Sequence, residues 1–260
     1  MNEGNPVDIK ALTELAKTTK EVFPKTVDET DSALSTLIGW FDDFILYPMK
    51  KARITYRYKL ECFEEDLRKK VEKIPPEELQ MPKLMIAGPT LEALKYSYDE
   101  QTLREMFVNL LATSMDRRQN ASIHPAFVEI IKQLSPLDAR FINIFRNRNS
   151  YPGITVYKKT HDIVTPYLQD VIELYEFSNS FEKFEQIHLT MVLDNLIRLG
   201  LIVKDSELLD AIYDYSSLEK HWQYQEYERV KGINSTLIYK KFQIDLTELG
   251  RAFKRCCLEK

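Results

Sequence analysis

The apolar pattern of the chain changes at Ser135, and the order of elements predicted after this residue constrains the fold more than any other feature. The sequence Ser135-Pro136-Leu137-Asp138 is typical of a helix start, because serine caps free backbone N–H groups and proline suits the first turn. We predict a helix from there to about residue 147, a turn at 151–153 and a short strand of β-branched and aromatic residues at 154–157.

The rest of this region combines helices and strands. Apolar spacing predicts helices at 166–177 and 181–199, and Gly200 then provides a left-handed cap before an apolar strand at 201–203. Residues 237–246 alternate as another strand, and Thr247 caps a last helix that runs to residue 257. This order is that of a winged helix with an acidic and aromatic insert at 206–234. We therefore predict a winged-helix-like α+β domain over 135–260.

The first half of the chain, residues 1–134, is predicted to be a helical domain. A long helix over 32–74 is expected to bend or break at Pro48, which lacks an N–H, and to end at Pro75-Pro76. Pro89 is expected in the first turn of a helix over 90–98, and further helices are predicted at 101–115 and 126–134. The fold class is therefore mainly α, with a long helix in the N-terminal domain.

Composition favours a globular protein of the cytoplasm. Hydrophobic residues make up 44% of the 260 residues and charged residues 29%, a balance that supports a sizeable core. The apolar stretches are far shorter than the roughly 20 residues that span a bilayer, and the start of the chain lacks the pattern of a signal peptide. The three cysteines have neither disulfide-framework nor zinc spacing, so we expect reduced thiols.

Charge is unevenly distributed, and its distribution bears on nucleic-acid binding. Residues 117–160 hold eight basic and two acidic side chains, whereas residues 161–228 hold four basic and 14 acidic ones. The predicted reading helix, 181–199, has a net charge of −1 and cannot neutralise phosphates, although its polar side chains could reach bases. The positive charge needed to neutralise phosphates would have to come from the wing and the last helix, through Lys240, Lys241, Arg251, Lys254 and Arg255. Protein contacts are therefore favoured over specific DNA binding.

A basic run in the N-terminal domain is a candidate interaction site. It lies next to aromatic residues and consists of Lys50, Lys51, Arg53 and Arg57. Such a pattern fits an amphipathic helix that touches anionic membrane. It also fits a helix of a bundle with a solvated basic edge, and we prefer this second interpretation.

Two other groups of residues are candidate interaction sites. Arg117, Arg118 and His124 could form an anion or nucleotide pocket, since histidine titrates near neutral pH, but a helix-capping role for His124 or its neighbour is the simpler interpretation. The insert contributes the aromatic residues Trp222, Tyr224 and Tyr227, which could bind a partner or cover the core.

Patterns typical of enzymes are missing from the sequence. There is no His-Glu-x-x-His or Cys-x-x-Cys pair, no phosphate-binding Gly-x-x-x-x-Gly-Lys loop and no Gly-x-Ser-x-Gly elbow. We therefore predict neither a catalytic site, nor a metal site, nor a cofactor.

The middle of the chain resembles a known family in the order and spacing of several blocks. These blocks include Lys73-Ile74-Pro75-Pro76-Glu77, the stretch from Pro82 to Pro89, the stretch from Leu103 to Asp116, and the stretch from His124 to Pro136. They are similar to the Abi-alpha family of bacterial proteins associated with abortive infection of phage-infected cells, with a family-like core at about 70–140. The resemblance implies a role in anti-phage defence.

Together these observations predict an anti-phage defence protein that acts through protein interaction, with itself, a host protein or a phage protein. One alternative is a winged-helix DNA-binding regulator. Another is a membrane-active effector that makes peripheral contact through the helix near 40–59.

Overall fold

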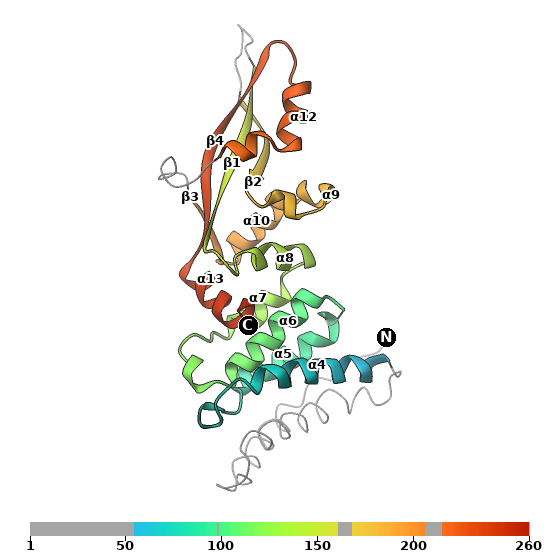
Figure 1. Cartoon of the computed structure of the whole chain (residues 1–260), viewed down its shortest axis with the longest axis vertical. Helices are drawn as coiled ribbons and strands as arrows, with labels where there is room; N and C mark the ends of the chain where they lie inside the picture. Colours follow the sequence, from blue (N-terminus) through green and yellow to red (C-terminus); the bar gives the residue numbers. More distant parts are fainter. Residues whose placement is uncertain (1–54, 98, 161–167, 206–214, 260) are drawn as a thin grey trace, which may run out of the picture.

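The elongated molecule has a helical end and an end formed by a sheet (Figure 1). A computed structural model describes residues 55–97, 99–160, 168–205 and 215–259. The helices α4 (Thr55–Val71), α5 (Leu84–Ser97), α6 (Gln101–Ser114) and α7 (Ala126–Lys132) gather at one end, and a four-stranded antiparallel sheet extends from the other. Between them lies α8 (Pro136–Ile144) (Figure 1).

The helical end is organised around α6. Its apolar residues recur three or four positions apart, and Leu103, Phe107 and Leu110 are all buried. α4 and α5 pack against α6. The 3₁₀ turn η2 (Pro76–Glu78) lies between α4 and α5, and η3 (Arg117–Gln119) lies between α6 and α7. The predicted helices at 101–115 and 126–134 are confirmed as α6 and α7. α4 is the described part of the predicted 32–74 helix, and residues 32–54 lie outside the described residues.

The position of Pro89 differs from the prediction. α5 begins at Leu84, so Pro89 lies inside the helix and not in its first turn. A proline inside a helix removes one backbone hydrogen bond, but the turn before it is held by the burial of Ile86 and Ala87. Tertiary packing therefore extends this helix in the N-terminal direction beyond its local start signal.

The predicted start of α8 is confirmed in detail. Ser135 Oγ accepts a hydrogen bond from Asp138 N at 3.1 Å, and Asp138 Oδ2 accepts one from Ser135 N at 2.7 Å, which is a capping box. Phe141, on the buried face of α8, lies in a cluster of aromatic rings that also contains Phe145, Tyr151, Tyr175, Phe177 and Phe181. This cluster joins α8 to the sheet and to the chain that leads into the next helices.

The sheet consists of β1 (Ser150–Thr160), β2 (Leu168–Tyr175), β3 (Ile202–Asp205) and β4 (Ser235–Leu246), in the order β2-β1-β4-β3. At the centre of the sheet, Gly153 of β1 lies opposite both Tyr175 and Phe242. A Cβ atom on Gly153 would come within 2.4 Å of the Phe242 ring, so only glycine permits this close approach.

Two predictions for this region are wrong. Residues 168–175, predicted as helix, form the strand β2, and residues 151–153, predicted as a turn, lie inside β1. The apolar residues around Val171 and Ile172 fit the spacing of a helix as well as that of a strand. The segment forms a strand because it pairs with β1, and this pairing buries Leu174 and Tyr175.

The predicted helix 181–199 is divided into α9 (Lys183–Gln186) and α10 (Leu189–Arg198), preceded by the turn η4 (Ser178–Ser180). Gly200 then has a φ of +73°, as expected for a left-handed cap. The described part of the insert forms α11 (Ser216–Glu219) and α12 (Trp222–Val230), and α9 and α12 lie on the same side of the sheet (Figure 1).

The chain returns to its helical end after β4. Thr247 caps α13 (Glu248–Phe253), as predicted, by accepting a hydrogen bond from Gly250 N at 2.9 Å. A π-helix, η5 (Lys254–Leu258), follows and packs against α6. Asn109 Nδ2 of α6 donates to the backbone oxygen of Cys257 at 2.8 Å, and the Thr113 hydroxyl donates to that of Cys256 at 3.2 Å. η5 therefore belongs to the core of the helical end.

Candidate interaction surface

Three large apolar side chains project from α9, α10 and the break between them. Phe184, Ile187 and Met191 are 68%, 65% and 65% exposed, and they follow one another at intervals of three and four residues across the break between the two helices. The opposite side of α10 buries Leu189 and Val192 against the core. We call Phe184, Ile187 and Met191, together with Trp222 and Tyr227 of α12, the docking surface.

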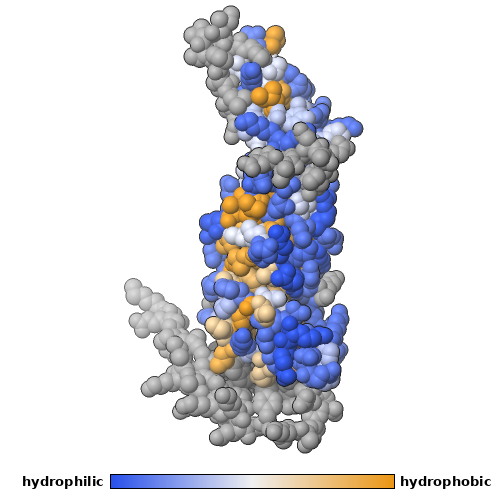
Figure 2. Space-filling view, turned by 90° about the vertical axis from the view of Figure 1, so that its left-hand side faces the viewer, coloured by the Kyte–Doolittle hydropathy of each residue, from blue (hydrophilic) through white to orange (hydrophobic). Residues whose placement is uncertain are grey.

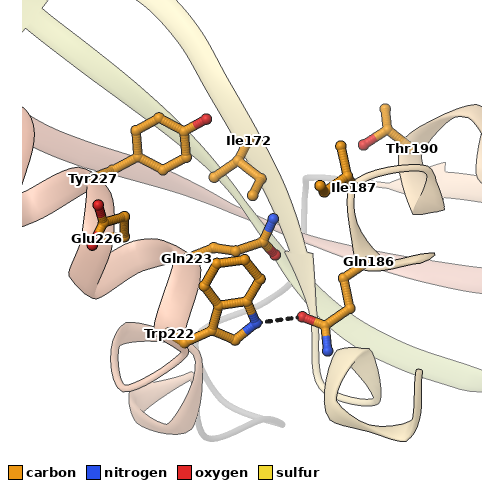
Figure 3. Close-up of a pocket in the computed structure, with 8 residues that line it drawn as sticks. All are labelled: Ile172, Gln186, Ile187, Thr190, Trp222, Gln223, Glu226 and Tyr227. Atoms are coloured by element: carbon orange, nitrogen blue, oxygen red, sulfur yellow. Dashed lines mark hydrogen bonds between the residues drawn. The ribbon is translucent and has the colours of Figure 1, made fainter. Parts of the chain in front are cut away.

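A pocket of about 300 Å³ lies in this surface, between α12 and the helices α9 and α10 (Figure 3). Trp222 extends from α12 and donates through its indole Nε1 to Gln186 Oε1 at 2.6 Å. Ile187 borders the pocket on the opposite side, and Ile172 of β2 lies between the two walls. The pocket is therefore largely apolar, with a few amide and carboxylate groups around it.

Hydrogen bonds and ion pairs fix the walls of this pocket. Gln186 is buried and also donates to the backbone oxygen of Phe181 at 2.9 Å. Arg140 of α8 pairs with Glu185 at 2.5 Å, and its guanidinium holds the pKa of that carboxyl below its usual range. On the other wall, His221 caps α12 by accepting from Gln223 N through Nδ1 at 3.4 Å. Burial lowers the pKa of His221.

The surroundings of the docking surface are rich in acids. Glu182 and Asp194 are exposed on the α9–α10 side, and Glu226 lines the pocket from α12. Lys183 provides a positive charge, but its Nζ lies 5.1 Å from the centre of the Trp222 ring. This arrangement suits a partner that presents apolar side chains flanked by basic ones.

The polar side chains that could have read DNA bases from this helix are mostly engaged within the protein. Gln186 bonds to Trp222, Thr190 hydrogen-bonds with the hydroxyl of Tyr175, and Asn195 Nδ2 donates to Asp138 Oδ2 at 3.0 Å. His188 is exposed.

Arg198, the basic residue of α10, is engaged as well. Its guanidinium donates to Asn195 Oδ1 and to Gln133 Oε1, at 2.7 and 3.1 Å. The exposed part of α10 therefore offers Met191, Asp194 and Ile197 to a partner more readily than cationic or amide groups.

The predicted basic residues of the wing and last helix also have contacts within the chain. Lys240 lies over the ring of Tyr157 and Lys241 over that of Tyr215, at 5.3 and 5.0 Å. Arg251 pairs with Glu248 at 3.3 Å, and Lys254 Nζ donates to Asn149 Oδ1 at 2.9 Å. Arg255 instead lines a separate pocket against α6.

The predicted anion pocket with His124 is not assembled. His124 is exposed, and its Nδ1 accepts a hydrogen bond from Ala126 N at 3.1 Å, which is the capping role at the start of α7. Arg117 is exposed, whereas Arg118 donates to both carboxylate oxygens of Asp116 and lowers the pKa of that carboxyl. Arg118 lines the pocket against α6, away from His124.

The basic run of the N-terminal domain is mostly outside the described residues. Lys50, Lys51 and Arg53 lie there, and Arg57 belongs to the first turn of α4. The membrane contact inferred from them stays a prediction. In the described part of the chain, no helix is long and apolar enough to cross a membrane, and no three His, Cys, Asp or Glu side chains are grouped as metal ligands.

The aromatic residues of the insert are divided between the pocket and the core. Trp222 and Tyr227 line the pocket, while Tyr224 is half-buried against the core. Phe184, Ile187 and Met191 were not among the predicted site residues, because the prediction for this helix rested on its charged and polar side chains. Their helical spacing was a usable signal, but apolar spacing normally marks the buried face.

A second apolar region lies on the face shown in Figure 2, where hydrophobic residues form a strip along the long axis between hydrophilic flanks. In the strands, Val203 of β3 and Ile238 of β4 are large apolar residues with substantial exposure. Exposed apolar surface of this kind is found on proteins that bind partners.

A sequence model of the abortive infection alpha (Abi-alpha) family matches residues 55–257. The chain belongs to this family. The match includes the docking surface, the sheet and most of η5, and so extends well beyond the predicted core at 70–140. The surface that lies on α9, α10 and α12 is thus within the part of this Abi-alpha protein that the family defines.

Other comparisons add little to this assignment. No curated protein matches the Abi-alpha chain. One solved structure is that of an uncharacterized protein from the hydrocarbon-degrading marine bacterium Alcanivorax borkumensis SK2. It is 14% identical in sequence, and the match covers 53% of this chain and 92% of the other chain, with a TM-score of 0.33. A likeness of that size carries no argument about the fold.

Proposed function

We propose that this Abi-alpha protein acts in anti-phage defence, in the cytoplasm, by binding a partner protein and without a catalytic step of its own. The observation that carries the proposal is the docking surface. Single exposed apolar residues are ordinary, but Phe184, Ile187 and Met191 are three highly exposed apolar residues within eight positions, and Ile187 lines a pocket together with Trp222. Aromatic and large apolar residues around a pocket are typical centres of binding energy in protein interfaces.

The docking surface is carried, in this proposal, by a winged-helix-like unit that contacts protein and not DNA. The order α8, β1, α9–α10, β3, β4 and the adjacency of β1, β4 and β3 support this description, with β2 as an additional strand at the edge. α10 then occupies the position of a reading helix. Its exposed Met191, Asp194 and Ile197 favour an apolar, basic protein partner over phosphates.

The proposal is tested by a triple variant, Phe184→Ser, Ile187→Ser and Met191→Ser, expressed in bacteria challenged with a panel of phages. The parent protein should reduce plaque formation by at least some of these phages, and the triple variant should lose this protection. Its circular dichroism and melting temperature should match those of the parent, because all three side chains are mostly exposed.

The matched control is the variant Leu84→Ser and Met85→Ser, which removes exposed apolar side chains at the far end of the molecule. It should protect as the parent does. The proposal is refuted if the folded triple variant still protects fully, or if the parent gives no protection against any phage of the panel.

A gel-shift titration separates this function from the DNA-binding alternative. A phosphate-binding protein shows affinity at low salt that falls steeply as salt rises. We expect no shift at low salt. A strong shift that disappears with salt and with Lys240→Ala and Lys241→Ala would replace protein binding by DNA binding as the function of this unit.

A further inference from the structure

The pocket of the docking surface contains a buried polar side chain without a partner. Gln223 of α12 is only 6% exposed and lines the pocket. Its backbone N–H donates to His221, but its side-chain amide has no hydrogen-bond partner among the described residues. Figure 3 shows this amide extending from α12 toward the opposite wall, next to Ile172. The pocket therefore offers one acceptor and two N–H donors to its occupant.

The walls around this amide are apolar and already in place. Trp222 and Tyr227 extend from α12, and Ile187 belongs to the opposite wall. The indole of Trp222 is held by its hydrogen bond to Gln186, a buried side chain that also bonds to the backbone. A site that is ordered before binding loses less free energy when an occupant enters. Its volume of about 300 Å³ is at the lower limit of ligand pockets, so it suits a large side chain more than a whole cofactor.

The charges at the pocket favour an uncharged occupant. Glu226 is the one charged side chain among the described residues that line it, and both of its carboxylate oxygens accept from Arg229, at 2.6 and 3.1 Å. A charged group that entered would lose its hydration without gaining an unpaired opposite charge. The side chain that fits the pocket is therefore apolar, with a neutral polar group next to it that pairs with Gln223.

A peptide group is the neutral partner that matches a primary amide. It carries one N–H and one C=O, which complement the acceptor and the donors of Gln223. Within a helix these two groups bond to other peptide groups of the same segment, so an extended segment presents them more readily beside a side chain. The amide thus distinguishes between two ways in which a partner could bind.

We propose that the pocket binds an extended segment of the partner protein. This segment inserts a large apolar anchor, such as leucine, between Trp222 and Ile187, and the peptide group beside the anchor pairs with Gln223. The inference rests on the proposed function and deepens it, because it states which chemistry of the partner the docking surface recognises.

The proposal is tested by selecting a library of random short peptides, displayed on yeast, for binding to the full chain. The selected peptides should share one position that is large and apolar. The tightest of them is synthesised and its affinity measured by isothermal titration. Replacing its anchor with alanine should weaken binding at least about tenfold. A selection that yields no binders, or binders without a common apolar position, would overturn the proposal.

The variant Gln223→Met tests the pairing with the peptide group, because methionine has a similar length but no amide. It should bind the selected peptide at least about tenfold more weakly, since the peptide group then enters the pocket without a partner. The matched control, Gln225→Met, makes the same change at an exposed position of α12 that does not line the pocket. It should bind within about twofold of the parent. Unchanged affinity in the first variant, or an equal loss in the control, would contradict the pairing.

Two changes to the peptide test the same contact without altering the protein. N-methylation of the backbone amides that flank the anchor, one at a time, should weaken binding about tenfold at one of them, because it removes the donor. Proline placed three residues after the anchor should leave the affinity within about threefold if the segment is extended, whereas it would disrupt a helical segment. No effect of methylation, or a loss of more than about tenfold with proline, would overturn the extended mode.

These results and the phage challenge can fail separately. If the triple serine variant loses protection but no selected peptide depends on Gln223, the inference fails and the proposed function stands. If the folded triple variant still protects fully, the proposed function fails whatever the peptides show.

Discussion

Replacing Phe141 with alanine is expected to lower the free energy of unfolding by about 5 kcal/mol. The side chain is fully buried and lies at the centre of the aromatic cluster. Its ring stands nearly perpendicular to those of Phe177 and Tyr175, with centroids 4.9 and 5.8 Å away. A buried Phe→Ala substitution costs about 3–5 kcal/mol, and each perpendicular ring pair adds about 0.5–1.5 kcal/mol beyond burial, so the upper end of the range applies.

The chain provides a control with the same chemistry in the opposite environment. Phe184 is 68% exposed, so Phe184→Ala should change stability by less than about 0.5 kcal/mol. Both variants are compared with the parent by urea unfolding, followed through circular dichroism at a helical wavelength. A loss below about 2 kcal/mol for Phe141→Ala, or similar losses for the two variants, would refute the assignment of this cluster as the centre of the core.

Three further predictions concern pH, backbone packing and thiol chemistry. Burial lowers the pKa of His221 below its ordinary value of 6.5, so near this pH the folded chain binds fewer protons than the unfolded chain, and stability should fall as pH drops below 6.5 toward the folded-state pKa. The variant His221→Asn keeps a capping side chain, and its urea unfolding should lack this part of the pH dependence. Gly250→Ala should lower the melting temperature, since its Cβ would lie 2.0 Å from the backbone oxygen of Leu201, whereas Gly88→Ala has open space in a helix and should raise it. Burial raises the pKa of Cys256 to about 11, so iodoacetamide at pH 8 should alkylate it only after unfolding, as mass spectrometry can show.

Local signals predicted the capped helix starts well. Ser135 and Thr247 form caps because a hydroxyl one residue before a helix can accept from its free N–H groups, and this depends only on neighbouring sequence. β2 could not be predicted in the same way. Its residues suit a helix or a strand, and the choice depends on β1 as a partner.

The candidate site was only partly predictable for a related reason. Trp222 and Tyr227 were identified from aromatic composition, and both line the pocket. Phe184, Ile187 and Met191 were missed because sequence alone does not say which of two apolar sides of a helix faces the core. α10 buries Leu189 and Val192 and leaves Met191 exposed, and that choice is made by packing against α8 and β3.

The packing of the C-terminal π-helix on α6 leads to a last prediction, for deletion of residues 254–260. The prediction placed η5 in the domain 135–260, but η5 packs on α6, a helix of the predicted domain 1–134. Arg146 Nε donates to the backbone oxygen of Leu258 at 2.7 Å, in addition to the two bonds from Asn109 and Thr113. Three such bonds, at about 0.5–1.5 kcal/mol each, and the burial of Leu258, at about 1.5–3 kcal/mol, predict a loss of about 5 kcal/mol.

The measurement is urea unfolding of the truncated and full chains. Arg255→Ala is the control within the same π-helix, because its side chain is exposed and should contribute less than about 0.5 kcal/mol. The loss on truncation should appear in the unfolding of the helical end, since the deletion uncovers the face of α6 that Cys256 and Cys257 bury. An unchanged midpoint after truncation would mean that these bonds do not stabilise the helical end, and that η5 lies on α6 without supporting it.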